Sequence, residues 1–153
     1  MPIFIQRQHP KRTSVRLLRR AVKKTLAAEG ITDRSVEISI ALVNDETIRE
    51  LNAKYRGKDT PTDVLSFPME QDIAIPGITR LLGDVVISID TALRQAEAGK
   101  RSLDEELCHL VIHGVLHLLG YDDATTEGYE EMVRKGEAIW RSVEAADDAE
   151  PDA

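Results

Sequence analysis

The stretch from His113 to Asp123 constrains the fold of this chain most strongly, because it sets two histidines on one helical face directly before a break. Side chains four residues apart lie one turn apart on the same face of a helix, so the imidazoles of His113 and His117 can converge on one ion. Gly120 then supplies the residue type that ends helices in a left-handed conformation without steric cost. Asp123 follows this break with a carboxylate. The spacing predicts a helix, a turn and a metal site where the two meet.

Helical histidines that pack in a core or face solvent are the alternative interpretation of this stretch. Three of the four histidines of the chain, His109, His113 and His117, occupy one helical stripe. His109 lies roughly 12 Å along the helix axis from His117, whereas bonds from nitrogen to zinc are only about 2.0 to 2.1 Å long. His109 therefore cannot share an ion with His117. We expect it to support a ligand or face a substrate, and simple packing is an equal alternative.

The spacing His-x3-His-x2-Gly-x2-Asp resembles the long metzincin signature, in which the chain turns at the glycine and returns a third ligand. Metalloproteases carry a glutamate directly after the first histidine as the general base, and Gly114 occupies that position here. A peptidase would lack its base in such a site. A metal that activates water or polarises a phosphoryl oxygen does not need that glutamate.

Composition predicts one soluble globular domain. The chain has 153 residues, of which 42% are hydrophobic and 31% are charged, and this is long enough to bury a core. Its N-terminal apolar run is too short for a signal peptide, and no apolar run approaches the roughly 18 residues of a membrane span. We therefore expect a cytoplasmic protein. Cys108 is the single cysteine, and its apolar surroundings favour a buried, inert thiol.

Charge is distributed unevenly along the chain, whose net charge is -7. Residues 1–28 contain no acidic residue, and this basic block can either contact phosphates or form a solvated face. Its basic residues are Arg7, Lys11, Arg12, Arg16, Arg19, Arg20, Lys23 and Lys24. Residues 144–153 are acidic and are predicted to form a disordered tail that follows a functional domain over residues 1–143.

Hydrophobic periodicity and turn residues predict four strands and five helices. The strands are expected over 2–6, 36–43, 63–67 and 83–88, and the helices over 14–29, 45–55, 90–98, 103 to about 119 and 126–143. Asn44, Asp90 and Ser102 are the predicted N-caps of the second, third and fourth helices. Residues 69–82 are predicted to form a loop over a site. This order favours a single α/β or α+β domain.

Three sequence blocks resemble the YbeY family of bacterial rRNA maturation factors. They are Leu51-Asn-x-x-Tyr-Arg56 leading into Thr62-Asp-Val-Leu-Ser-Phe-Pro68, then Leu82-Gly-Asp-Val-Val-Ile-Ser88, then His113-Gly-x-Leu-His-Leu-x-Gly-Tyr-Asp122. The resemblance implies an α+β fold with a mixed four-stranded sheet, about five helices and a metzincin-like metal helix and turn. It also implies a metal-dependent endoribonuclease specific for single-stranded RNA, which acts in rRNA maturation, including the 3′ end of 16S rRNA, and in ribosome quality control.

The resemblance also implies site residues, with one departure. His113 and His117 match the first two metal ligands, and Arg56 matches a functionally important arginine. The family pattern has a third histidine where this chain has Asp123. A carboxylate is an accepted zinc ligand, so we expect His113, His117 and Asp123 to hold one divalent ion, most simply Zn²⁺. Asp122 is a competing ligand.

In this scheme Arg56 and His113 are the expected catalytic residues. Lys58 and the basic block are expected to hold the RNA backbone, with rRNA and the ribosome or its small subunit as partners. Two alternatives remain open from the sequence. One is a ribosome-assembly factor that acts mainly by binding, with a structural metal, and the other is a metallohydrolase with a different substrate.

Overall fold

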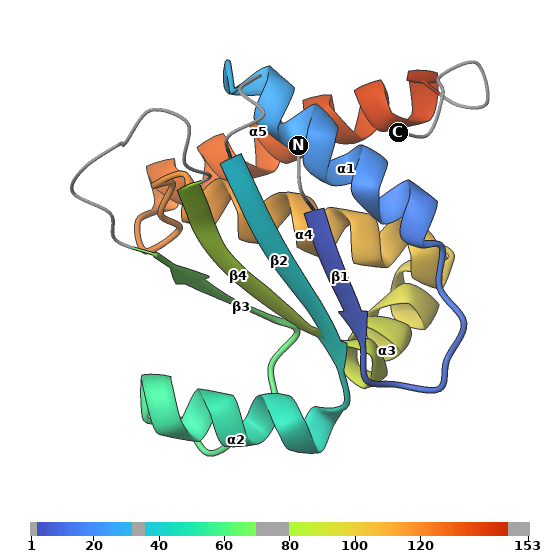
Figure 1. Ribbon diagram of the computed structural model, residues 1–153, viewed down its shortest axis with the longest axis vertical. Coiled ribbons are helices and arrows are strands. Elements are labelled where there is room, and N and C mark those ends of the chain that lie inside the picture. Colours follow the sequence, from blue (N-terminus) through green and yellow to red (C-terminus); the bar gives the residue numbers. More distant parts are fainter. Residues whose placement is uncertain (1–2, 32–35, 70–79, 147–153) are drawn as a thin grey trace.

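The computed structural model describes residues 3–31, 36–69 and 80–146, in which five helices and four strands follow one another in the predicted order (Figure 1). The strands are β1 (Ile3–Arg7), β2 (Val36–Val43), β3 (Val64–Pro68) and β4 (Arg80–Ser88). The helices are α1 (Val15–Ala28), α2 (Asp45–Arg56), α3 (Ile89–Gly99), α4 (Leu103–Leu118) and α5 (Thr126–Ala146). No helix in these described segments is both long enough and apolar enough to cross a membrane.

The four strands form one mixed sheet in the order β1-β2-β4-β3. β1 and β4 both run parallel to β2, whereas β3 runs antiparallel to β4 and pairs Ser66 with Val85. The α+β class and the mixed four-stranded sheet predicted from the sequence are therefore confirmed. This order places β3 at an edge of the sheet, and that edge contributes to the site described below.

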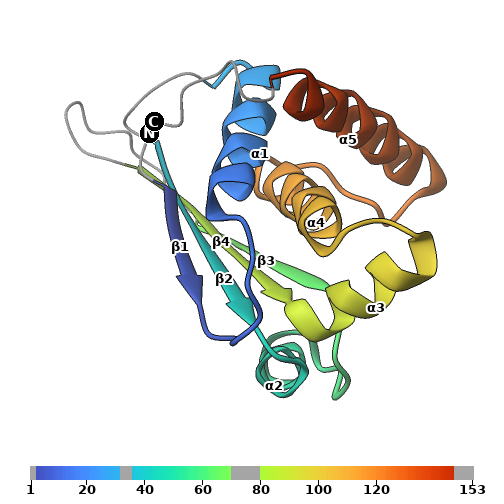
Figure 2. The ribbon, with the colours of Figure 1, turned by 90° about the vertical axis from the view of Figure 1, so that its right-hand side faces the viewer.

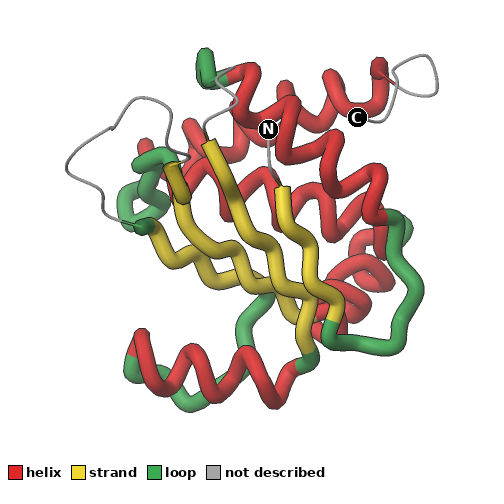
Figure 3. Tube along the Cα trace, viewed as in Figure 1, coloured by secondary structure: helices red, strands yellow, loops and turns green. Residues whose placement is uncertain are grey.

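Helices cover the two faces of the sheet unequally (Figures 1 and 2). Alternate residues of β2, including Ile38 and Ile40, are buried in the main core beneath α1, α4 and α5. The intervening residues face α2, where Val43 packs in a smaller cluster with Ile48. The strand period of two thus divides the apolar residues between two layers of helices, and the sheet lies between them in Figure 3.

α4 is the central helix of the main layer. It contacts α1, α3, α5, β3 and β4, and buries a run of apolar residues that includes Leu107, Val111 and Leu116. Cys108 is buried on the same helix, as predicted. Burial, reinforced by nearby carboxylates, raises the pKa of this thiol to about 12, so the cysteine stays protonated and unreactive at neutral pH.

Three sequence predictions about element ends are wrong. Ser88, and not Asp90, is the N-cap of α3, because its hydroxyl accepts a hydrogen bond from the Thr91 amide. β4 begins at Arg80 and not at Gly83, because the strands stay paired past a bulge at Leu82, with Glu37 opposite Leu81 and Ile38 opposite Gly83. The predicted loop over 69–82 is therefore wrong at its end, and its residues 70–79 lie outside the described segments.

The last helix ends later than predicted, because α5 continues through Ala146 and not only to about residue 143. Val143 is fully buried and anchors this last part of the helix in the main core. The predicted acidic tail from residue 144 stays a prediction, since its residues 147–153 lie outside the described segments.

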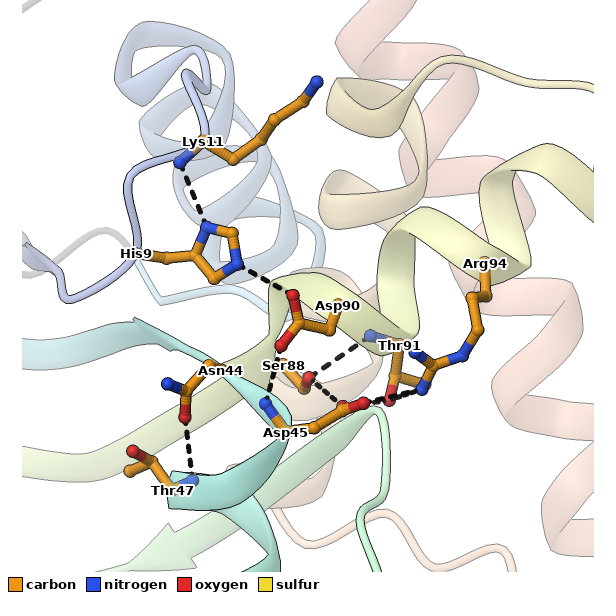
Figure 4. A network of polar contacts seen from close by, with 9 residues as sticks. All are labelled: His9, Lys11, Asn44, Asp45, Thr47, Ser88, Asp90, Thr91 and Arg94. Carbon is orange, nitrogen blue, oxygen red and sulfur yellow. Dashed lines mark hydrogen bonds and ion pairs between the residues drawn. The ribbon is translucent and has the colours of Figure 1, made fainter.

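A polar network joins the start of α3 to the start of α2 and to the connection before α1 (Figure 4). Asp90 accepts a hydrogen bond from the Asp45 amide at 2.9 Å, and its other oxygen lies 2.8 Å from His9 Nε2. These two contacts lower the pKa of Asp90. Asp45 in turn accepts hydrogen bonds from Ser88, Thr91 and Arg94, which lower its pKa against the opposing effect of burial.

We predict that Asp90→Asn destabilises the protein near neutral pH and much less in acid. A carboxyl whose pKa is lowered by folding contributes stability above its usual pKa, and this contribution is lost as the pH falls through the folded value. The Asp90 side chain is 37% exposed, so we expect a loss below about 1 kcal/mol. Urea unfolding of the parent and the variant checks this. The difference between their free energies of unfolding should become smaller below about pH 4. A difference in the free energy of unfolding that does not change with pH would contradict the stabilising role of the ionised Asp90 carboxylate.

Candidate metal centre

Three side chains from α4 and the following turn bring a ligand atom each to one point. The Nε2 atoms of His113 and His117 are 3.0 Å apart, and they lie 3.4 and 3.5 Å from Asp123 Oδ2. Ligands bonded to one tetrahedral ion at about 2.1 Å lie about 3.4 Å from each other. The triangle therefore fits a single ion, and these three residues can hold a metal.

His117 is held in the tautomer that a metal requires. Its Nδ1 lies 2.9 Å from the carbonyl oxygen of Tyr121. A carbonyl oxygen only accepts, so Nδ1 must carry the proton and Nε2 keeps its lone pair toward His113 and Asp123. Hydrogen bonds of this kind orient metal-binding histidines in proteins.

The turn after α4 returns Asp123 to the two histidines. Gly120 has a φ of 103°, and its amide donates to the carbonyl of His117, while the amide of Tyr121 donates to that of Leu116. This pair of bonds is the Schellman motif, which reverses the chain at a helix end. The helix stop predicted at Gly120 is confirmed.

A second set of contacts ties this turn to α1 and α5. The hydroxyl of Tyr121 donates to the carboxylate of Glu29, which also pairs with Lys135 at 3.3 Å. The hydrogen bond to Glu29 raises the pKa of Tyr121. Since the carbonyl of Tyr121 also orients His117, one residue links the ligand turn to two distant helices.

Gly114 lies where α4 packs closely against the sheet. A Cβ atom at this position would lie 2.7 Å from Val85 Cγ1 and 3.2 Å from Ser66 Oγ. The carbonyl of Gly114 accepts a hydrogen bond from that hydroxyl at 2.9 Å. The position that carries the general base in metalloproteases thus faces the sheet in this protein, with no room for a glutamate.

Arg56 and the three ligands line one hollow of about 480 Å³, which we call the arginine-side hollow. Arg56 is the last residue of α2, and its Nη2 donates to the carbonyl of Ser66 at 2.7 Å. Its guanidinium also lies over the ring of Phe67, 5.7 Å from the centroid. The structure therefore brings the predicted catalytic arginine and the predicted ligands to the same site.

A second hollow, of about 450 Å³, lies on the other side of the ligands between α4 and α5, and we call it the tyrosine-side hollow. Both hollows are lined by Asp63, His113 and Asp123. His109 lines the second hollow, outside the ligand triangle, where its ring packs against Trp140 at 5.1 Å between centroids.

The remaining sequence candidates have different surroundings. Asp122 lines the arginine-side hollow, but its Oδ1 accepts a hydrogen bond from the Ala124 amide at 3.0 Å, which engages it in the turn. Lys58 is exposed and lines neither hollow among the described residues. Asp63 was missed by the sequence analysis, although it lies in the first resembling block and lines both hollows.

The electrostatics of the site favour neutral imidazoles. Burial lowers the pKa of His113 most, and the neighbouring His117 lowers it further. The carboxylates of Asp123 and Asp63 act in the opposite direction. Burial also lowers the pKa of His109, with Arg101 acting in the same direction. Neutral imidazole is the form that binds metal ions, so the site suits a cation at neutral pH.

Comparison with known proteins agrees with this arrangement. The family model described as endoribonuclease YbeY matches residues 4–144. Endoribonuclease YbeY of Moorella thermoacetica is 47% identical over 132 residues, covering 82% of this chain and 84% of that protein. The Anaeromyxobacter protein of the same name is 46% identical over 143 residues, which cover 93% of this chain and 72% of that protein.

The chain belongs to the YbeY endoribonuclease family. The solution structure of TM1509 from Thermotoga maritima is also similar, with a TM-score of 0.59 at 27% identity over 98% of this chain and 97% of that one. This solved structure therefore has a similar fold along nearly the full length of both chains. The resemblance that the sequence blocks predicted is confirmed.

We predict that Tyr121→Phe weakens metal binding without unfolding the protein. Loss of one hydrogen bond to a charged partner should lower the free energy of unfolding by about 1 to 3 kcal/mol. Loosening the turn that orients His117 should weaken metal affinity by about 10-fold or more. Competition with a chromogenic chelator measures this affinity. Tyr55→Phe, at a tyrosine that is 55% exposed on α2, is the control, and equal affinities for the two variants would contradict the role of Tyr121.

Proposed function

We propose that this chain is a metal-dependent endoribonuclease that cleaves single-stranded RNA during rRNA maturation. The observation that carries the proposal is the ligand triangle of His113, His117 and Asp123, which opens into a hollow that also contains Arg56. The relatives named above are endoribonucleases by name. A nuclease needs a group that activates the attacking oxygen and a cation that stabilises charge on the phosphate, and this site provides for both.

We propose one Zn²⁺ per chain as the bound ion. Two imidazole nitrogens and one carboxylate oxygen form a donor set that zinc takes at catalytic sites. Bound there, the ion would supply an activated water or polarise a phosphoryl oxygen. His113 and Asp123 are 34% and 40% exposed, so the site is open to a polymeric substrate.

Arg56 supplies the phosphate-binding group in this proposal. Its planar guanidinium can donate two parallel hydrogen bonds to phosphate oxygens. The bond from Nη2 to Ser66 holds the group at the hollow. Arg56 would thereby bind the scissile phosphate and stabilise the negative charge that develops as the attacking oxygen approaches phosphorus.

The surroundings of Gly114 disfavour the competing peptidase function, because the glutamate that such an enzyme uses has no room there. A metallohydrolase with a different substrate predicts no cleavage of RNA, and the other competitor is a binding factor with a structural metal. It predicts RNA or ribosome binding without turnover, which the experiment below distinguishes.

The wider cellular role is part of the same proposal. We place the protein in the cytoplasm, with the ribosome or its small subunit as the partner and ribosome quality control as a further role. The basic block on β1, α1 and their connection lines neither hollow, so we assign it to RNA or ribosome contacts away from the cleaved bond. Lys58, which lies outside both hollows, is assigned to the same kind of contact.

We predict that Arg56→Ala lowers the cleavage rate of single-stranded RNA by about 100-fold or more, as expected when a preorganised donor to a transition state is removed. Chelation of the metal should abolish cleavage, and added Zn²⁺ should restore it. Arg49→Ala is the matched control, since Arg49 is an arginine of the same helix that pairs with Glu46 and Asp59. Cleavage that persists in the folded Arg56→Ala protein or after chelation would refute the proposed chemistry.

A further inference from the structure

The two hollows flank the ligand triangle and are continuous with it. Asp63, His113 and Asp123 belong to the walls of both. An RNA chain continues on both sides of the phosphate that is cleaved. If that phosphate lies at the ligands, the neighbouring nucleotides must leave the site through these hollows.

The two hollows differ in chemistry. The arginine-side hollow is lined largely by polar groups, such as Arg56, Thr62 and Ser66. The tyrosine-side hollow has apolar walls from both helices, with Leu110 on α4 and Met132 on α5. Polar walls suit the sugar and phosphate, whereas apolar walls suit the flat face of a base.

The mouth of the tyrosine-side hollow carries large side chains that are unusually exposed. Tyr129 is 55% exposed and Val133 is 41% exposed, one turn apart on α5. Both line the hollow whose walls also include His113 and Asp123. An exposed aromatic ring next to a nuclease centre is the kind of surface on which single-stranded bases stack.

Polar groups at the same hollow can recognise the edge of a base. Arg101 carries donors and Glu137 carries acceptors, and a neutral His109 whose Nε2 faces Glu105 keeps Nδ1 as an acceptor. The ring of His109 packs against Trp140, and the Nε2 atom of His109 lies 3.6 Å from the carboxylate of Glu105. A hollow that combines apolar walls with hydrogen-bond donors and acceptors can hold an unpaired nucleobase.

We propose that the tyrosine-side hollow holds the base of a nucleotide adjacent to the scissile phosphate, with Tyr129 stacked on that base. This inference rests on the proposed function, because it takes RNA as the substrate. Tyr129 then acts as a specificity-determining residue, and His109 as a group that faces the substrate. A short single-stranded RNA is the occupant, and a side chain of a protein partner is the competing occupant.

An RNA with abasic positions tests this directly. The cleavage site of a short single-stranded RNA is first mapped with the unmodified protein, and each nucleotide next to that site is then replaced by an abasic one. Removing the base on one side should lower kcat/KM by about 5- to 150-fold, the range of one base-aromatic stack.

Variants of Tyr129 assign this loss to the hollow. Tyr129→Ala should lower kcat/KM on the full RNA by a similar factor and show no further loss on the abasic RNA, whereas Tyr129→Phe should behave like the parent. Phe4→Ala is the matched control, because Phe4 is 54% exposed on β1. The inference fails if abasic positions cost nothing in the parent, or if Tyr129→Ala remains as sensitive to them as the parent.

Fluorescence anisotropy with the same labelled RNAs separates this inference from the proposed function. If the parent cleaves RNA without regard to the neighbouring bases, the hollow is not a base site and the proposed function stands. If the parent binds single-stranded RNA and loses affinity on Tyr129→Ala but cleaves no RNA, the proposed function fails, and only base binding at the hollow is supported. If Tyr129→Ala impairs only binding to ribosomal subunits, a protein partner occupies the hollow and the inference fails.

Discussion

The contact between α4 and the edge of the sheet is the constraint on which the rest of this structure depends. Ser66 on β3 contributes to this contact, because its hydroxyl donates a hydrogen bond to the carbonyl of Gly114 on α4. The carbonyl of Ser66 also accepts a hydrogen bond from Arg56, the last residue of α2. One residue therefore sets the distance between the helix that carries the ligands and the arginine that faces them. Because a side chain at position 114 would meet Val85 and Ser66, glycine keeps this distance short.

Sequence patterns predicted most of the fold and the central part of the site, because both follow from local rules. Apolar periodicity placed the five helices and four strands, and the spacing of His113 and His117 on one helical turn needs no tertiary information. The stop at Gly120 is likewise a local property of the chain. The family resemblance supplied the sheet arrangement and Arg56, which local patterns do not contain.

What the sequence did not predict depends on contacts between distant residues. Ser88 and Asp90 are both suitable N-caps, and the choice is made by the Asp45 amide, which engages Asp90 elsewhere. The bond between Tyr121 and Glu29 joins residues 92 positions apart. Asp63 gave no local signal, because its importance lies in its position between two hollows that form only when α4 packs on the sheet.

The central claim is that Asp123, at the position where the sequence resemblance implies a third histidine, completes the metal site. Metal content after dialysis, measured by plasma mass spectrometry, tests this claim most directly on the parent, Asp123→Asn, Asp123→His and Asp122→Asn proteins. We expect one ion per chain for the parent, Asp123→His and Asp122→Asn proteins, and loss of the ion from Asp123→Asn on dialysis. An Asp123→Asn protein that keeps its ion as tightly as the parent, or an Asp122→Asn protein that loses it, would contradict the account.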